Sequence, residues 1–399
     1  MKELTDRSKE AARRPVPRPI ERIPFNRPQA VGAELDYVLD AIARAELASN
    51  GRFSERCAAW LEERTGARKA LLVHSATAAL EMTAILLELE PGDEVIMPSF
   101  TFVSTANAVA LRGAIPVFVD VRPDTLNIDE GVIEDAITPR TKAVVAVHYA
   151  GVPCEMDAIS EVAQRHGLIV VEDAAQALTS TYKGRAAGAL GDAAAISFHE
   201  TKNLHCGEGG ALLVRRSDWV ERAVVLRDKG TNRNRFLRGE VDKYSWVDLG
   251  SSYGLGELSA AFLWAQLERA EEVLADRRLA WYAYHERLAP LEAEGLLRRP
   301  IIPDHVDHNA HLYYVLVRDL EERNRVIHEL DRRGVHAIFH YVPLHSAPAG
   351  RQLGRTHGEL RETEAAADRL LRLPLWYRMP AEAVDRVASA VAEVVSQPS

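Results

Sequence analysis

One lysine in this 399-residue sequence stands in a setting that suits covalent chemistry. Lys202 lies on a polar turn between the apolar segment Ala194–Phe198 and the Gly-rich bend Gly207–Gly210, which opens a second apolar segment. A lysine held on such a turn can reach into a cleft, lose its charge through desolvation and form a Schiff base with an aldehyde. The setting therefore predicts a nucleophilic lysine.

A carboxylate upstream of Lys202 extends this prediction. Asp173 follows an apolar run, Leu168–Val171, and so lies at the carboxyl end of a predicted strand, where open α/β sheets place ligands. Lysine and aspartate together suggest pyridoxal phosphate (PLP), with the lysine for the aldehyde and the aspartate for the ring nitrogen. Taken alone, Asp173 could equally be a helix N-cap or part of an ion pair. Gln176 could contact the phenolic oxygen of the ring.

A strand that passes directly into a helix offers a phosphate site. Ser75, Ala76 and Thr77 fall where the first N–H groups of a helix are free of intrahelical partners. Those donors and the helix dipole suit a phosphate group. An ordinary Ser or Thr N-cap is the alternative, and it is favoured unless Lys202 and Asp173 are considered with it.

Two further side chains could face a cofactor. Phe102 follows the predicted strand Glu94–Met97 and could stack on the PLP ring, although its sequence context alone favours a core aromatic. Ser197 precedes Lys202 closely enough for both to face one cofactor, and a serine satisfied within its strand is the alternative.

Two clusters of polar residues leave alternatives open. His199, Glu200, His205 and Cys206 surround the lysine, but their spacing matches no closed tetrahedral zinc pattern, so we expect no metal. A basic segment without clear periodicity either presents its side chains to a diphosphate or forms a solvated loop. Its charged residues are Arg227, Lys229, Arg233, Arg235, Arg238 and Lys243.

The order of apolar segments predicts the fold class. Strand and helix patterns alternate from about residue 24 to residue 267, which favours an α/β fold with a mostly parallel sheet. A strand, helix, strand pattern after Ile301 and a closing helix predict a smaller α+β domain. We expect a flexible leader over residues 1–20, a large domain over 21–270 and a small C-terminal domain over 271–399.

Composition narrows the classes of function. The formal net charge is −9, which argues against non-specific binding of nucleic acid, and 47% of the residues are hydrophobic, enough to build a core. The longest apolar runs have the length of strands, so no membrane span is expected. The polar N-terminus and three cysteines without CxxC spacing favour a cytoplasmic enzyme with reduced thiols.

These motifs together resemble those of the DegT/DnrJ/EryC1/StrS family, the PLP-dependent sugar aminotransferases of fold type I. Within the family, the likeness is greatest to the dTDP-4-amino-4,6-dideoxygalactose transaminase group. The segments that carry it are Ser197–Leu204, Gly207–Gly210, Val171–Gln176 and Pro98–Asn107.

The resemblance implies a fold, a reaction and partners. It implies an aspartate aminotransferase-like fold, L-glutamate as amino donor with 2-oxoglutarate as its product, and a nucleotide-linked keto sugar as acceptor, here dTDP-4-keto-6-deoxyglucose. It also implies a homodimer with shared active sites. Ser252 takes the place of an asparagine that the partner subunit supplies to the phosphate in many members.

The resemblance also assigns substrate contacts. Tyr341 and His345 match a family segment near the sugar, and Arg233 and Lys243 of the basic segment are expected at the diphosphate. A 3-keto sugar or an aminocyclitol remains an alternative acceptor, and a non-catalytic PLP-fold regulator is an alternative of another class. A nicotinamide dehydrogenase is disfavoured because no G-x-G-x-x-G follows the first strand.

Overall fold

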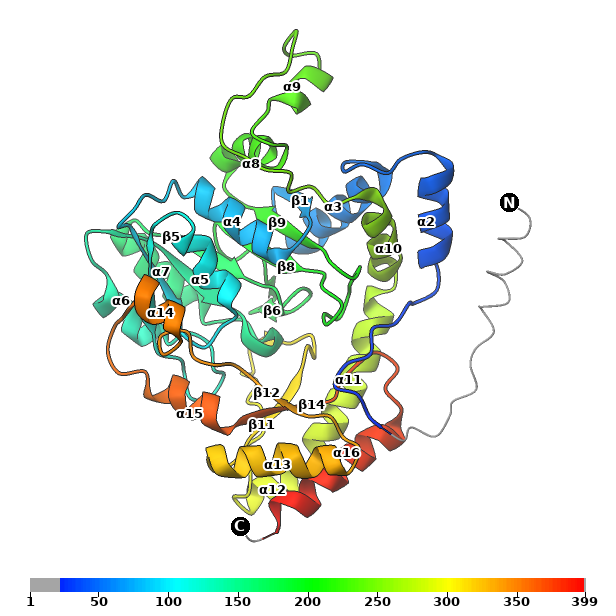
Figure 1. The fold of residues 1–399 in the computed structure, drawn as a ribbon, viewed down its shortest axis with the longest axis vertical. Helices are drawn as coiled ribbons and strands as arrows, with labels where there is room; N and C mark the ends of the chain where they lie inside the picture. The colour runs from blue at the N-terminus through cyan, green and yellow to red at the C-terminus, as the bar shows by residue number, and fades with distance from the viewer. Residues whose placement is uncertain (1–21, 398–399) are drawn as a thin grey trace.

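A large eight-stranded sheet forms the centre of the computed structural model, which describes residues 22–397 (Figure 1). The predicted leader lies outside the described residues. The strands are, in spatial order, β1 (Lys69–Val73), β9 (Gly210–Val214), β8 (Ala193–Ser197), β5 (Ile169–Asp173), β4 (Thr141–Val147), β2 (Glu94–Pro98), β3 (Ile115–Val119) and β13 (Arg355–Thr356). Only β9 runs antiparallel to its neighbours, so the predicted mostly parallel α/β sheet is confirmed.

Both faces of this sheet are covered by helices, which explains why its strands are almost entirely apolar. One face packs against α4 (Ala76–Leu86), α5 (Val103–Ala110) and α8 (Val220–Arg227). The other face packs against α3 (Arg52–Thr65), α6 (Ile133–Ala136), α7 (Met156–His166) and α10 (Glu257–Glu268). The N-terminal helix α2 (Glu34–Ala43) lies against α10.

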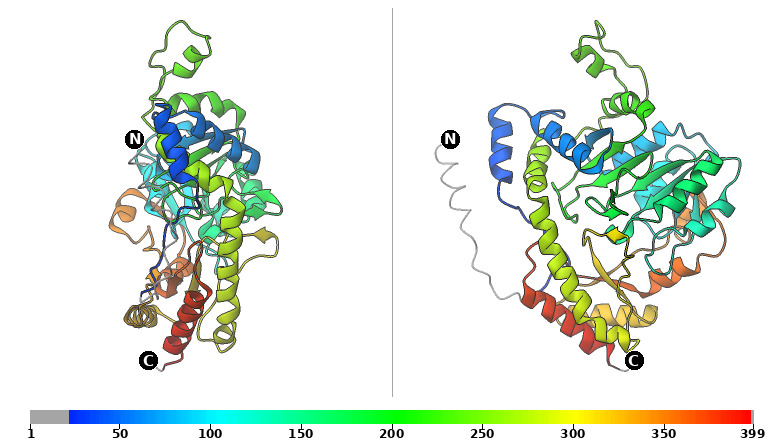
Figure 2. Two further views of the ribbon diagram at one scale, coloured as in Figure 1. Left: turned by 90° about the vertical axis from the view of Figure 1, so that its right-hand side faces the viewer. Right: turned by 180° about the vertical axis from the view of Figure 1, so that it is seen from behind.

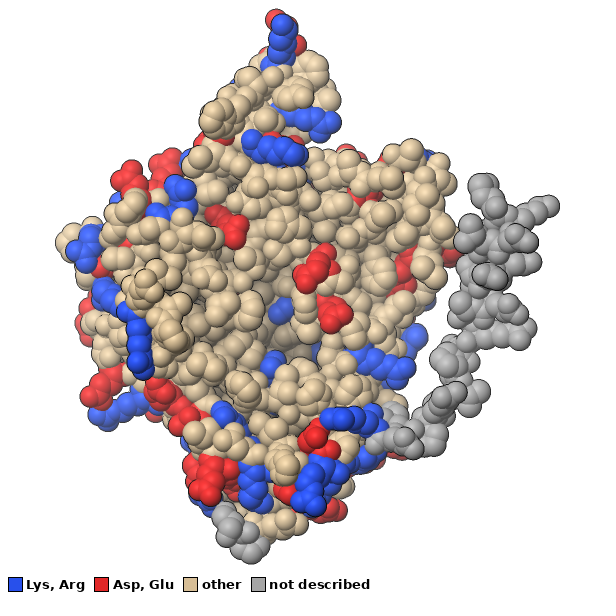
Figure 3. Space-filling model, viewed as in Figure 1, with Lys and Arg blue, Asp and Glu red and all other residues tan. Residues whose placement is uncertain are grey.

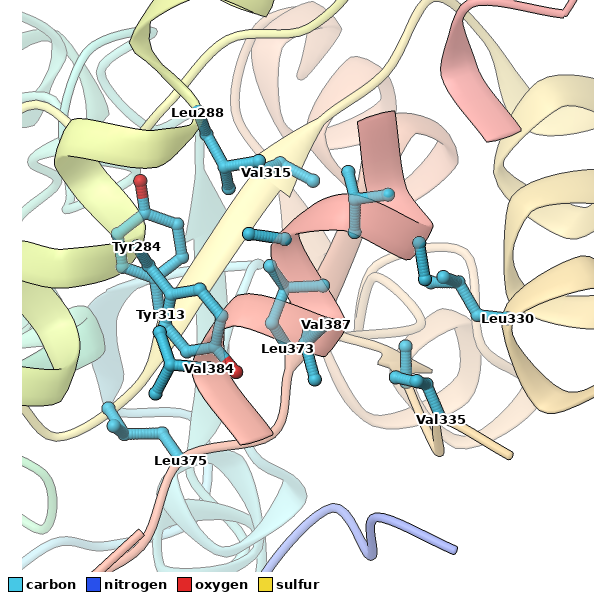
Figure 4. Packing of buried hydrophobic residues seen from close by; sticks show 14 of the residues in the cluster. Tyr284, Leu288, Tyr313, Val315, Leu330, Val335, Leu373, Leu375, Val384 and Val387 are labelled. Carbon is cyan, nitrogen blue, oxygen red and sulfur yellow. The ribbon is translucent and has the colours of Figure 1, made fainter. Parts of the chain in front are cut away.

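A second, three-stranded sheet forms the lower part of the molecule in Figure 1. Its strands are β11 (Tyr313–Leu316), β14 (Leu370–Leu373) and β12 (Ile338–Phe339), all antiparallel. The covering helices are α11 (Ala270–Arg287), α13 (Leu320–Arg332) and α16 (Ala381–Val395). Figure 4 shows this core, in which Tyr284, Tyr313, Val384 and Val387 lie close together. The structure does not test the predicted boundary at residue 270, which stays a prediction.

The remaining elements are short. They are the helices α9 (Arg233–Leu237), α12 (Ala289–Ala293), α14 (Pro348–Leu353) and α15 (Arg361–Arg369), the 3-10 turns at 130–132, 149–151 and 217–219, and the strands β6 (Thr181–Tyr182), β7 (Arg185–Ala186) and β10 (Val306–Asp307). No helix among the described residues has the length and apolar character needed to cross a bilayer.

An arm, which we define as residues 229–249, projects from the body of the molecule and carries α9 (Figures 1 and 2). It contains most of the basic segment that the sequence showed without clear periodicity. Several large apolar side chains on the arm are exposed: Phe236, Leu237, Tyr244, Trp246, Val247 and Leu249. The arm therefore presents both cations and apolar surface away from its own chain.

Candidate active site

A cavity of about 560 Å³ lies between the carboxyl ends of the large sheet's parallel strands and the small sheet. Figure 3 shows a hollow near the middle of this face with Lys or Arg atoms inside it. The cavity brings together most of the residues predicted from the sequence: Ser75, Ala76, Thr77, Phe102, Asp173, Gln176, Ser197, Lys202 and Tyr341. Because the strands are parallel and in register, side chains far apart in the chain meet at one edge of the sheet.

Lys202 lies on the turn that follows β8, as its sequence setting predicts. The backbone N–H of Lys202 donates to the carbonyl of His199 at 2.9 Å, which fixes the turn. Burial lowers the pKa of the Lys202 ammonium to about 8. The positive charge of Arg372 also lowers this pKa, whereas the negative charge of Asp173 raises it. A minor but usable fraction of this lysine is therefore already a free amine near neutral pH, the form that can act as a nucleophile or base.

Asp173 ends β5 and is held by two donors. Thr105 Oγ1 donates to Asp173 Oδ2 at 2.8 Å, and the N–H of Ala175 donates to Oδ1 at 3.2 Å. The hydroxyl of Thr101 lies 3.0 Å from that of Thr105 and extends this network. The carboxylate is buried, so its orientation is set by these contacts, and it faces the cavity that Lys202 also lines.

The start of α4 opens into the same cavity. Ser75 caps the helix, since its Oγ accepts a hydrogen bond from the N–H of Ala78 at 3.1 Å. The ordinary N-cap interpretation is thus correct, and it is compatible with an anion site because the earliest N–H groups of a helix have no intrahelical acceptor. Thr77 Oγ1 lies 2.8 Å from Ser104 Oγ.

Close packing of β9 against this helix start depends on a glycine. A Cβ added to Gly210 would lie 2.4 Å from the carbonyl carbon of Ser75 and 2.5 Å from the nitrogen of Ala76. Any larger residue would therefore displace the first turn of α4. The cradle at the helix start fits a phosphate group in both its donors and its space.

Three side chains complete the wall. Phe102 is 57% exposed and lines the cavity, so the alternative that it is a core aromatic is wrong. Gln176 accepts from the N–H of Ala150 at 2.7 Å and donates to Tyr341 Oη at 3.0 Å. This pair connects the large sheet to the segment that follows β12.

Four predicted residues do not line the cavity of their own chain. Arg233 and Lys243 lie on the arm, and Ser252 is exposed and pairs with Asp228 in an isolated bridge. His345 contacts Ser99 through Nδ1 at 2.8 Å and Glu364 through Nε2 at 2.9 Å, so both of its ring nitrogens have protein partners.

Sequence reasoning missed three residues at the site. Thr105 lies in the first turn of the helix after Phe102, a position from which a hydroxyl can reach a neighbouring strand end. His311 and Arg372 line the cavity from the small sheet's side. Arg372 could have been found from the sequence, because it is the single charged residue within the otherwise apolar run Leu370–Leu375.

Within residues 22–397, no three His, Cys, Asp or Glu side chains are grouped as a metal site would require. Cys57, Cys154 and Cys206 all carry free thiols, and burial raises the pKa of each.

Comparison with known proteins assigns the chain to a family. The model of the DegT/DnrJ/EryC1/StrS aminotransferase family matches residues 29–392. GDP-perosamine synthase from Caulobacter vibrioides is 35% identical over 383 residues, which cover 94% of this chain and 99% of the relative. The chain belongs to the DegT/DnrJ/EryC1/StrS aminotransferase family.

Solved structures agree with this assignment. The aminotransferase TlmJ from Streptoalloteichus hindustanus is 33% identical, with a TM-score of 0.86 and coverage of 94% of this chain and 99% of that one. The putative sugar aminotransferase Spr1654 from Streptococcus pneumoniae, in a form containing PLP, is 28% identical with a TM-score of 0.86 and covers 94% and 98%. The protein is thus a PLP-dependent sugar aminotransferase, and its cavity fits the cofactor in donors, carboxylate and lysine.

Proposed function

We propose that this aminotransferase moves the amino group of L-glutamate to the 4-keto carbon of a nucleotide-linked 4-keto-6-deoxyhexose. The proposed acceptor is dTDP-4-keto-6-deoxyglucose, and the products are 2-oxoglutarate and a dTDP-4-amino-4,6-dideoxyhexose. The observation that carries the proposal is the meeting of Lys202 and Asp173 in one cavity. The resemblance of the sequence motifs to 4-aminotransferases supports the choice of sugar.

The residues that would hold the cofactor are among those that line the cavity. The first N–H groups of α4, with Ser75, Ala76 and Thr77, would bind its phosphate, and Asp173 would pair with its ring nitrogen. Phe102 would lie against its ring, while Gln176 and Ser197 would contact its polar edge. When bound, PLP supplies the electron sink for the pair left behind when the C–H bond at the amino-bearing carbon breaks.

Lys202 moves the protons. Its Nζ accepts the proton released from the α-carbon of glutamate, and in the second half-reaction it delivers a proton to C4 of the sugar. The lowered pKa keeps a useful fraction of the amine unprotonated near neutral pH. Thr105 and Ala175 hold the carboxyl group of Asp173 in place at the cavity.

We further propose that the active enzyme is a homodimer with shared active sites. Arg233, Lys243 and Ser252 do not line their own chain's cavity, and the arm projects away from it (Figure 2). The partner's arm would bring the two cations to the diphosphate, and the partner's Ser252, which follows the arm in the sequence, would reach the phosphate of PLP. Tyr341, which lines the cavity, would contact the sugar, and His345 would support that wall.

A GDP-linked sugar is the second candidate acceptor. The observation that favours it is the Caulobacter relative, whose name, GDP-perosamine synthase, places GDP on its sugar. The same chemistry at C4 would apply, and only the contacts to the base would differ.

One incubation tests both candidates. The purified, PLP-loaded protein is first incubated with L-glutamate, which transfers its amino group to the cofactor. Separate samples then receive the dTDP-linked 4-keto-6-deoxyhexose, the GDP-linked one, a 3-keto isomer or an aminocyclitol ketone. NMR of the product identifies the aminated carbon and its configuration. We expect amination at C4, and Lys202→Ala should abolish it. A protein that reacts with glutamate but aminates neither 4-keto sugar would refute the proposed substrate. A protein that does not react with glutamate at all would favour the non-catalytic alternative.

A further inference from the structure

The segment 309–311 connects two parts of the candidate active site that are far apart in the sequence. It lies between β10 and β11, and its last residue, His311, lines the cavity. One end of the segment is bonded to the chain that follows β5, and both ends are bonded to the residue after Lys202. The segment therefore joins the strand that carries Asp173 to the turn that carries the lysine.

Asn309 attaches the segment to the chain that follows β5. Its Nδ2 donates to the carbonyl of Gln176 at 2.8 Å and to that of Leu178 at 2.9 Å. The backbone N–H of Asn309 donates to Ser180 Oγ at 3.1 Å. These buried contacts fix the segment against the strand end on which Asp173 lies.

A buried cation holds the backbone of the same segment. Arg277 lies in α11, which packs in the cores of both the large and the small sheet (Figure 1). Its guanidinium donates to the carbonyls of Ala310 at 3.2 Å, His311 at 2.5 Å and Leu375 at 3.4 Å. Ala310 has a φ of 51°, which is unusual for a residue other than glycine and persists only where surrounding contacts maintain it. Arg277 thus keeps the segment in a conformation that its sequence alone disfavours.

Asn203, the residue after Lys202, is bonded to this segment twice. Its Nδ2 donates to the carbonyl of Asn309 at 2.7 Å, and its Oδ1 lies 3.1 Å from Nδ1 of His311. Lys202 and these three residues line a void of about 10 Å³, which has room for one water at most. The lysine turn is therefore bonded to the segment in a space that leaves it little freedom to move.

The two bonds of Asn203 also decide which nitrogen of the His311 ring carries a proton. Because the amide nitrogen of Asn203 donates to a carbonyl, the atom that faces Nδ1 is the amide oxygen, which can only accept. Nδ1 of His311 is therefore protonated. Burial lowers the pKa of His311 well below its ordinary value, and the charges of Lys202 and Arg277 lower it further. The ring is thus neutral at neutral pH, and Nε2 keeps its lone pair.

We propose that Asn203 is a positioning residue for Lys202. Its carboxamide holds the lysine turn against the 309–311 segment and fixes the tautomer of His311. Because the segment is also attached to the strand end of Asp173, the amine and the carboxylate keep one relative placement. Asn203 does not line the main cavity, so it acts through its neighbours. The inference rests on the proposed role of Lys202 as the residue that binds the cofactor's aldehyde, and not on the identity of the sugar.

Capture of PLP by the cofactor-free protein tests this placement without turnover. Stopped-flow absorbance gives the rate of capture, and borohydride reduction followed by mass spectrometry of peptides identifies the lysine that holds PLP. Asn203→Ala should slow capture by Lys202 about tenfold, because an amine that is no longer held spends less time in the reactive geometry. Asn203→Asp keeps the shape of the side chain but cannot donate to the carbonyl of Asn309, so it should also slow capture.

Variants of His311 show whether the same contact is responsible. His311→Ala removes the contact from the other side, so the double variant with Asn203→Ala should capture PLP no more slowly than the slower single variant. His311→Asn places an amide nitrogen where the ring has Nδ1 and so restores the donor to Asn203. Its capture rate should lie within about threefold of the parent rate.

Asn127→Ala is the matched control for a merely structural role. Asn127 is also buried and also makes two contacts, since its Nδ2 donates to the carbonyl of Val152 at 2.9 Å and its Oδ1 accepts from the N–H of Tyr149 at 2.8 Å. It does not line the cavity. Asn127→Ala should lose stability to urea as Asn203→Ala does, yet capture PLP at the parent rate.

The glutamate half-reaction of the PLP-loaded proteins gives a second readout. A positioning role predicts that Asn203→Ala lowers the maximal rate about tenfold, while the glutamate concentration at half-maximal rate changes less than about threefold. Asn127→Ala should change neither quantity.

The outcomes that contradict the proposal are distinct from those that contradict the function. Parent-like capture in Asn203→Ala and Asn203→Asp would overturn it, as would an equal loss of rate in Asn127→Ala or fully additive losses in the double variant. If Asn203→Ala fails to fold, Asn203→Asp and the His311 variants still decide. Capture by another lysine in the parent would refute the role of Lys202 and this inference with it. A parent that captures PLP at Lys202 but aminates no sugar would refute only the proposed acceptor.

Discussion

At the scale of single residues, the site depends on Lys202 and Asp173 and on the groups that surround each of them. Lys202 is buried with a lowered pKa, so it can release its proton near neutral pH. Asp173 accepts hydrogen bonds from Thr105 and Ala175, which fix the orientation of its carboxylate. An amine that loses its proton readily and a fixed carboxylate in one cavity are what proton transfer beside a pyridinium ring needs.

The first prediction concerns the stability of the cofactor-free protein. Burial lowers the pKa of Lys202 from 10.5 to about 8, so the unfolded chain binds more protons between these values. The penalty for the buried charge is present below pH 8 and disappears as the pH rises toward 10.5. Lys202→Met should therefore be more stable than the parent at pH 7, with an advantage that shrinks from pH 8 to 10. Urea unfolding across this range measures it, and an advantage independent of pH would contradict the lowered pKa.

The second prediction concerns the support of Asp173. Thr105→Val removes the hydroxyl that donates to Asp173 Oδ2 and should slow the glutamate half-reaction about tenfold, since a hydrogen bond to a charged group is lost. Thr105→Ser keeps the hydroxyl and should stay near the parent rate. Stopped-flow absorbance gives the rate. Equal rates for the valine and serine variants would show that Thr105 does not position the carboxylate. Asp173→Asn should slow the reaction by orders of magnitude.

At the scale of elements, the site is a junction of strand ends and one helix start. β5 carries Asp173, the turn after β8 carries Lys202, and the N-terminus of α4 lines the same cavity. The antiparallel strand β9 runs directly against the start of α4 at Gly210. The geometry of the phosphate cradle is thus set by how closely these two elements pack.

The third prediction follows from that contact. Gly210→Ala would place a methyl group 2.4 Å from the backbone of Ser75, so the first turn of α4 must shift. We expect a loss of about 1–3 kcal/mol in unfolding free energy and weaker retention of PLP. Gly256→Ala is the control, because its Cβ would meet nothing closer than 3.9 Å. Equilibrium dialysis measures PLP affinity, and equal affinities in the two variants would refute the proposed cradle.

At the scale of the whole molecule, the arm is the feature that a single chain does not explain. It carries exposed apolar residues and unpaired cations away from its own cavity. Arg235 and Arg238 pair with Glu240, whereas Arg233 and Lys243 form no ion pair with any described carboxylate. A second chain would cover the apolar surface and use the free charges.

The fourth prediction concerns assembly. Sedimentation velocity should give a species of about twice the 44.2 kDa chain mass. Trp246, which is 79% exposed on the arm, would be buried in that dimer, so Trp246→Glu should shift the equilibrium toward monomer. Leu279→Glu, at a 73% exposed position on α11 away from the arm, is the control. A parent protein that sediments only as monomer would refute the shared site.

The fifth prediction concerns the charges of the arm. Arg233→Gln and Lys243→Gln should each raise the KM for the nucleotide sugar about 10- to 100-fold, because a charge-assisted contact to the diphosphate is lost. The glutamate half-reaction should not change. Arg235→Gln, whose charge is already paired with Glu240, should have a smaller effect. If all three variants keep the parent KM, the diphosphate is bound elsewhere.

Local patterns in the sequence were sufficient for the class of fold and the centre of the site. Continuous apolar runs predict buried parallel strands because both faces of such a sheet are covered, and the predicted strand Glu94–Met97 is observed as β2, one residue longer. Lys202, Asp173 and the start of α4 could be found because each lies at the end of an element, and parallel strands bring such ends to one edge. Lys202 and Asp173 together suggested the cofactor, and the family pattern added the amino donor and the class of acceptor.

Only the tertiary structure decided the contacts between distant segments. Strand β13, with two residues, is too short to produce a periodic signal, and Phe102 is exposed because the cavity opens beside it. The pairing of Gln176 with Tyr341 and the lone charge of Arg372 depend on how the small sheet meets the large one. The physical reason is that element ends follow from local propensity and burial, whereas the partners of a buried polar group depend on which segments pack together.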